Sequence, residues 1–96
     1  MKICECFKLL KVGLFVKTNR DNLDFVGEII KIESDCIFIA TNELRFGRPM
    51  RDDMLKLAID RGYKNAVFMP RHIDYDIEIL DKLPVSKDSF NDDIGF

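Results

Sequence analysis

Hydrophobic and polar residues alternate over three successive segments between residues 13 and 42, which is the pattern of half-buried β-strands. Leu14, Val16 and Thr18 share one side of the first segment. Residues 36–40 are apolar on both faces, as expected of a central strand in a covered sheet. We therefore predict three consecutive strands separated by two polar turns.

The middle strand changes phase close to a glycine. Phe25, Gly27 and Ile29 fall on one face, whereas Ile30 and Ile32 fall on the opposite face. Both sets can be buried only if the strand bends or carries a bulge, and glycine is the residue that makes either easiest. We predict the bend near Gly27, with a tolerated surface glycine as the alternative.

Two segments show helical spacing instead. Residues 2–11 place apolar side chains, including Cys6, on one face of a short N-terminal helix. Residues 49–61 predict a second helix, with Pro49 at its first position and two aspartates in its first turn. Arg61 and Gly62 supply a basic last turn and a stop.

The second helix carries an apolar stripe that is either ordinary core or an adaptable binding surface. Met50, Met54 and Leu55 distinguish the two interpretations. Exposure of these side chains would indicate a protein interface, and their complete burial would argue against one.

Two further strands are predicted after this helix, over residues 66–69, ended by Pro70, and over residues 73–80. The second of these carries three carboxylates on one face. We interpret them as charges that discourage unwanted edge pairing, and we predict no metal site. The tail, residues 84–96, is acidic and aperiodic, and is predicted to be flexible unless Phe90, Ile94 and Phe96 dock on a partner.

Length and composition favour one small α+β domain over residues 1–83, since the chain has 96 residues, 47% of them hydrophobic and 33% charged. No apolar run reaches the ~18 residues that would span a bilayer, and no signal peptide is recognised. Three cysteines without a pairing framework are expected to be reduced, which predicts a cytoplasmic protein. We expect Cys6 and Cys36 to be buried and Cys4 to be the reactive thiol.

No catalytic or cofactor motif is found, because His72 is the only histidine and no nucleophile motif accompanies it. We therefore expect a protein that is not an enzyme and that needs no cofactor.

The predicted order of helix, three strands, helix and two strands resembles a small SH3-like barrel, and the residues are similar to the Sm-like (LSm) family. Residues 15–42 look like the first Sm motif and residues 66–80 like the second, separated by the unmatched residues 43–62. The resemblance implies a strongly bent antiparallel sheet that forms a barrel, a homo-oligomer joined through strand edges, and RNA as the ligand.

The resemblance also implies two groups of RNA contacts. Tyr63, Lys64 and Asn65 look like the segment of the bacterial Sm-like RNA chaperone in which a lysine and a histidine contact uridines, with Asn65 in place of the histidine. A second group would combine the turn at Arg71 and His72 with the turn between the second and third strands. There Asp35 stands in place of the family's asparagine.

The charge distribution is uneven although the net charge is only -2. Residues 45–71 contain seven basic and three acidic residues, whereas residues 74–93 contain two basic and seven acidic ones. A basic middle permits contact with RNA phosphates, but it is equally compatible with a polar protein interface or a solvated surface.

Overall fold

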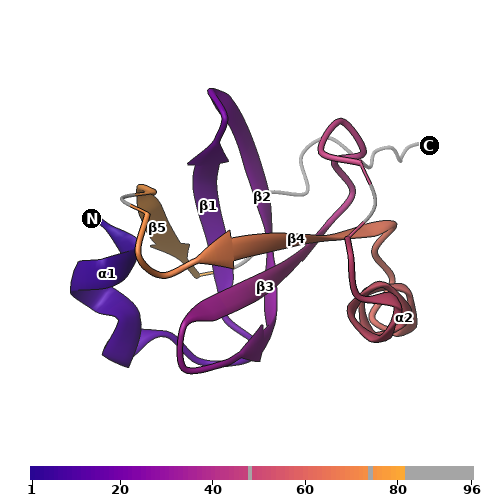
Figure 1. Ribbon diagram of the computed structural model, residues 1–96, viewed down its shortest axis with the longest axis horizontal. Coiled ribbons are helices and arrows are strands. Elements are labelled where there is room, and N and C mark those ends of the chain that lie inside the picture. Colours follow the sequence, from indigo (N-terminus) through magenta and orange to yellow (C-terminus); the bar gives the residue numbers. More distant parts are fainter. Residues whose placement is uncertain (48, 74, 82–96) are drawn as a thin grey trace.

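A computed structural model describes residues 1–47, 49–73 and 75–81 (Figure 1). In this part of the chain, five antiparallel strands form one sheet in the order β4-β3-β2-β1-β5. The elements are α1 (Ile3–Cys6), the 3-10 helix η1 (Phe7–Leu9), β1 (Phe15–Arg20), β2 (Leu23–Ile32), β3 (Cys36–Thr41), α2 (Asp52–Asp60), β4 (Asn65–Pro70) and β5 (Ile77–Leu80).

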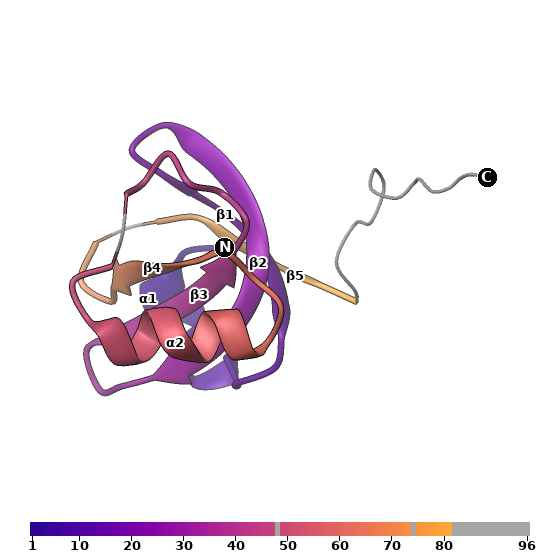
Figure 2. The same ribbon diagram turned by 90° about the vertical axis from the view of Figure 1, so that its right-hand side faces the viewer.

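The α+β class and the bent antiparallel sheet are confirmed, and the curvature is seen from the side in Figure 2. The predicted barrel is not closed, however: β4 and β5 occupy opposite edges of the sheet and do not pair with each other within the described residues. The predicted tail, residues 84–96, and the predicted domain boundary at residue 83 lie outside the described part of the chain.

The strands are in a register that aligns five residues in one row across the whole sheet. Glu28 lies opposite both Phe15 and Ala40. Ala40 in turn pairs with Ala66, and Phe15 pairs with Leu80. The end of β5 and the beginning of β4 therefore lie at the same level of the sheet, one at each edge.

The bulge in β2 lies beyond the glycine where it was predicted. Pairing with β3 shifts between Ile29 and Lys31, so the extra residue is Ile30. Gly27 serves a different purpose, because a Cβ there would fall well inside contact distance of the Ala40 carbonyl oxygen and 2.7 Å from Ile39 Cγ2. Gly27 is thus required by the close approach of β3, and not by the bulge.

The bulge distributes the apolar residues of β2 between two hydrophobic clusters. Ile29 lies in the cluster on the α1 side, where Ile32 also packs. Ile30 lies in the cluster beneath α2. The prediction that Ile30 and Ile32 share a face was wrong, because the extra residue at the bulge places Ile32 on the same side of the sheet as Ile29. All of β3 is buried between the two clusters, as predicted for a central strand.

Both helices are shorter than predicted. The N-terminal helix is α-helical only over Ile3–Cys6 and tightens into η1 before Leu10 becomes extended. The second begins at Asp52 and not at Pro49, because Arg51 has an extended backbone at the N-cap. Asp52 is in the first turn, as predicted, and Gly62, with φ +91°, follows the C-cap residue.

The last strand is also shorter than the alternating pattern over residues 73–80 indicated. Before Ile77 the chain bonds to the N-terminal segment: Ile3 N donates to Tyr75 O at 2.9 Å, and Ile77 N to Met1 O at 2.7 Å. The N-terminal residues therefore form the backbone hydrogen bonds that a longer β5 would have formed with a neighbouring strand. In the part of the chain described, no helix has the length and apolar character needed to cross a bilayer.

Candidate functional site

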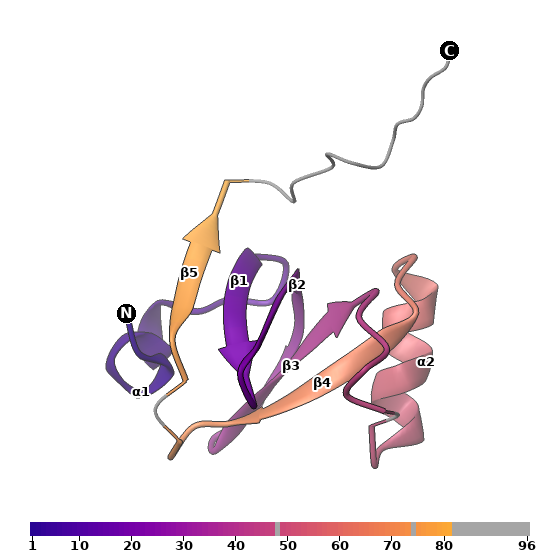
Figure 3. The same ribbon diagram turned by 90° about the horizontal axis from the view of Figure 1, so that it is seen from above.

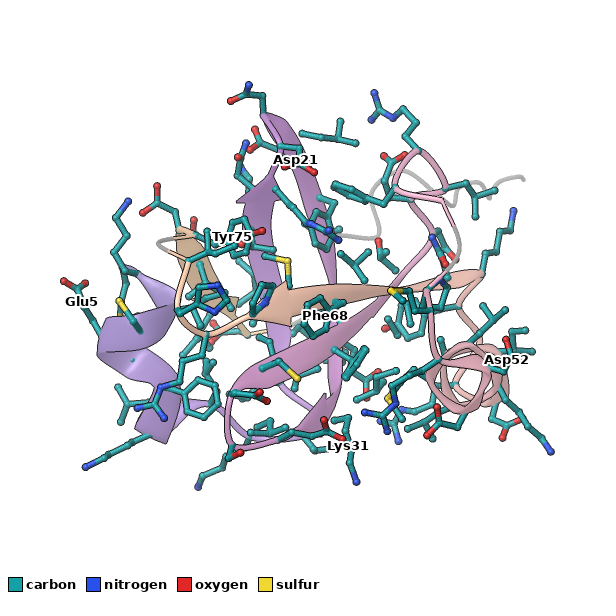
Figure 4. All side chains as sticks on the ribbon, in the orientation of Figure 1. Glu5, Asp21, Lys31, Asp52, Phe68 and Tyr75 are labelled. Atoms are coloured by element: carbon teal, nitrogen blue, oxygen red, sulfur yellow. The ribbon has the colours of Figure 1, made fainter. Side chains whose placement is uncertain are left out.

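The predicted RNA-binding residues lie at the two ends of β4. This strand runs from the neighbourhood of α2 to that of α1 (Figure 1). We call its beginning, with Tyr63, Lys64 and Asn65, the α2 end, and the turn after it, with Arg71 and His72, the α1 end. Figure 4 labels Phe68 on β4 between the two ends.

At the α1 end, the two turns that the Sm-like resemblance brings together are in contact. Arg71 N donates a hydrogen bond to Asp35 O at 2.8 Å, which continues the pairing of β3 with β4 beyond Cys36 and Pro70. The Asp35 side chain is exposed, and so is His72. The two turns are therefore adjacent in space, and their role in binding RNA stays a prediction.

The Arg71 side chain is held against the protein surface. Its guanidinium lies 4.3 Å from the centre of the Phe7 ring, and Nη1 donates to Ser34 O at 3.3 Å. A cation over an aromatic face is attracted by the negative electrostatic potential of that face, so this position is stabilised. The outer part of the guanidinium remains available, because Arg71 is only partly buried.

At the α2 end, two of the three predicted residues have structural roles. Asn65 is buried, and its Nδ2 donates to Gly47 O at 2.7 Å and to Glu43 O at 3.2 Å, which fixes the loop after β3. Tyr63 is partly buried, and burial raises its pKa. Of this group, only the Lys64 side chain is exposed.

A buried carboxylate that sequence reasoning missed organises the same end. Glu28 is 5% exposed and forms an ion pair with Nη2 of Arg61, which is the C-cap residue of α2. Tyr63 Oη also lies 3.2 Å from Glu28 Oε1. The only sign of this role in the sequence was that Glu28 stands between apolar residues of β2. Alternation alone would assign Glu28 to an exposed face.

The two ends are too far apart to form one pocket within a chain. Lys64 and Arg71 are separated by seven residue steps along an extended strand, or about 23 Å at ~3.3 Å per residue. The predicted set of six RNA-binding residues is therefore divided into Asp35, Arg71 and His72 at one end and Tyr63, Lys64 and Asn65 at the other.

Much of the basic character of residues 45–71 is neutralised by ion pairs. Arg45 pairs with Glu43 at 2.7 Å. Arg51 pairs with Glu33 at 2.8 Å and with Asp53 at 3.0 Å, and Arg61 pairs with Glu28. Arg48 lies outside the described residues. Of the basic residues in this range that the structure describes, those without a carboxylate partner are Lys56, Lys64 and Arg71.

The three predicted interface residues have different environments. Met54 is buried between α2 and the sheet, and Leu55 is partly exposed. Met50 is fully exposed, at 101% of its reference area. Met50 precedes α2, so within the helix itself the predicted stripe is core at Met54 and partly exposed at Leu55.

A groove of about 430 Å³ lies between β4 and the loop that precedes α2. Phe38 and Phe68 line it, with ring centroids 5.5 Å apart, and Met50 and Pro49 contribute from the loop. Arg51 also lines it, with its guanidinium 5.1 Å from the centre of the Phe38 ring. The groove is therefore mainly apolar and aromatic, and it runs beside the outer edge of β4.

The thiols have the predicted accessibility, with Cys6 and Cys36 buried and Cys4 exposed. Glu33, Asp35 and Cys36 place three ligand-type atoms within 4.8 Å of one another. Burial, reinforced by Glu33, raises the pKa of Cys36 to about 11, and a hydrogen bond from Arg51 lowers the pKa of Glu33. Glu33 accepts hydrogen bonds from Arg51 Nη1 at 2.8 Å and from Cys36 Sγ at 3.6 Å, so two of the three groups are already engaged with other side chains.

Comparison with other proteins identifies no relative. No protein-family model matches the chain, and no curated protein or solved structure has significant similarity to it.

Proposed function

We propose that this chain is a non-enzymatic, Sm-like RNA-binding protein that acts as a homo-oligomer in the cytoplasm. The observation that carries the proposal is the contact between the turns of Asp35 and Arg71. The Sm-like resemblance requires these two turns to meet, although 35 residues separate them in the sequence.

RNA binding is proposed at the α1 end. Arg71 provides a positive charge without a carboxylate partner among the described residues, beside the exposed side chains of Asp35 and His72. Phe7 holds the guanidinium in place, which reduces the entropy lost when a ligand binds. Lys64 would contribute only from the other end of β4, as a separate phosphate contact.

Self-association is proposed through the free edges of the open sheet. β4 is six residues long. Arg71 and Asp35 form a hydrogen-bonded pair, and such pairs alternate along antiparallel strands. The backbone N–H and C=O groups of Ala66 and Phe68 therefore point away from β3, toward the free edge. The edge of β5 is shorter, since Ile77 N is already bonded to Met1 O. Phe68, 40% exposed, lies on the longer edge (Figure 4).

Binding of a short uridine-rich oligonucleotide at several salt concentrations tests the RNA proposal. We expect affinity to fall steeply with salt, and Arg71→Ala to weaken binding by ~1–3 kcal/mol and to reduce the salt slope by about 1. Lys64→Ala should have a smaller effect, because Lys64 lies about 23 Å away along β4. Absence of binding, or equal effects of the two variants, would contradict the proposal.

Light scattering during size exclusion tests the oligomer separately. We expect an oligomer for the natural chain and a shift to monomer for Phe68→Lys, because a charge at a strand edge opposes pairing. Val12→Lys is the matched control, since Val12 is exposed but lies outside the sheet. A monomer for the natural chain would remove self-association from the proposal.

A further inference from the structure

A second hollow, of about 320 Å³, lies at the α2 end and shares Gly47 with the aromatic groove. Leu44, Leu55 and Ile59 line it. Leu44 and Ile59 are 58% and 56% exposed, so this part of the surface keeps large apolar side chains in water. Such a cluster is unfavourable unless something covers it.

The chemistry around the hollow limits what can cover it. Lys64 lines the hollow and has no carboxylate partner in the described part of the chain. Asn65 lines it as well, with its Nδ2 engaged by the carbonyls of Glu43 and Gly47. The hollow therefore fits a segment that combines apolar side chains with carboxylates.

The register of the sheet shows where the chain leaves the described structure. Leu80, the last residue of β5, is in the same row as Ala66 at the beginning of β4. Four strand spacings separate the two edges, or at most about 19 Å at ~4.8 Å each. In Figure 3 the end of β5 and the connection between α2 and β4 both lie toward the top of the view, the first at the left and the second at the right.

We propose that the C-terminal residues 88–96 of the same chain bind in the hollow of Leu44, Leu55 and Ile59. This segment contains Phe90, Ile94 and Phe96 as apolar groups, together with three carboxylates for Lys64 (Asp88, Asp92, Asp93). Seven intervening residues can span about 23 Å when extended, which exceeds the distance across the sheet. The chain is therefore long enough to reach from the end of β5 to the beginning of β4, where Lys64 and Asn65 line the hollow.

Covalent connection favours this contact over one with a separate molecule. A segment tethered by a short linker has an effective concentration in the millimolar range, so modest apolar burial and one charge pair are sufficient. The contact leaves the proposed RNA site at Arg71 and Asp35 unaffected, because it uses the α2 end, and it would compete with a phosphate only at Lys64.

Hydrogen–deuterium exchange on the full chain tests the inference. We expect the amides of residues 88–96 to be protected relative to a free peptide of the same sequence. Leu44→Asp should reduce this protection about tenfold, because it removes an apolar contact and adds a charge that repels the carboxylates. Lys64→Glu should reduce it as well.

Val12→Asp is the matched control, because Val12 has the same kind of exposure, at 56%, in a segment that does not line the hollow. Protection should be unchanged in this variant. Free-peptide exchange rates in the natural chain, or equal losses in Leu44→Asp and Val12→Asp, would overturn the inference. Protection that disappears on dilution would also overturn it, since the segment would then come from a second copy.

Discussion

The two ends of β4 use polar residues in different ways. At the α1 end, Arg71 is bonded through its backbone and rests on Phe7, with its charge unpaired within the described residues. At the α2 end, Arg61 is paired with the buried Glu28, and Asn65 is fixed by two carbonyls. The arginine at one end thus presents its charge to the surface, and the arginine at the other end attaches a helix to the sheet.

This difference explains why a basic segment need not be a binding surface. A charge that is paired inside the protein contributes little to phosphate affinity, because its field is already cancelled nearby. The α2 end is accordingly the more sensitive to mutation, and the α1 end is the more accessible to a ligand. Four substitutions test this contrast, and all are measured first by urea denaturation.

The largest effect is expected for Gly27→Ala at the α2 end. The new Cβ would collide with the Ala40 carbonyl oxygen in a central strand, so backbone must move, and we expect a loss of about 3 kcal/mol. Gly47→Ala is the control: its φ is +76° but no atom lies within 4 Å of the added Cβ. The control should lose about 1 kcal/mol through backbone strain alone. Equal losses would mean that the close approach of β3 is not the reason for Gly27.

The next largest effect is expected for Arg61→Met, which leaves the buried Glu28 carboxylate with Tyr63 as its remaining partner. We expect a loss of roughly 2 kcal/mol, less than for a fully buried pair because Arg61 is itself exposed. Lys64→Met, three residues away, should have almost no effect on the unfolding free energy. A similar loss in both variants would show that Glu28 does not depend on its ion pair.

The sequence predicted the strands and the meeting of the turns better than it predicted the roles of the charged residues. Alternation located β1 and the first half of β2, and a run that is apolar on both faces located β3. It could not place the bulge at Ile30, since this depends on pairing with β3. Nor could it identify Glu28 as buried, because its partner Arg61 comes from a distant helix cap.

A smaller effect is expected for Phe7→Leu at the α1 end. The substitution removes the ring beneath Arg71 but keeps an apolar side chain, so we expect a loss of about 1 kcal/mol. Oligonucleotide binding should persist, because the charge of Arg71 remains. Arg71→Ala, in contrast, should weaken binding by ~1–3 kcal/mol. If Phe7→Leu weakened binding equally, the ring and not the charge would be the essential group.

The smallest effect is expected for Glu43→Gln, and it should depend on pH. Hydrogen bonds from Arg45 lower the pKa of Glu43 from its ordinary value near 4.5 to about 2, so the ionised form is favoured in the folded protein. Its contribution is therefore complete above about pH 4.5 and is lost as the pH falls toward 2. The difference in unfolding free energy between the natural chain and Glu43→Gln should shrink over this interval. A difference that stays constant from neutral pH to pH 2 would show that Glu43 acts through its shape, and that the α2 end is held by Asn65 and Glu28 without help from this exposed pair.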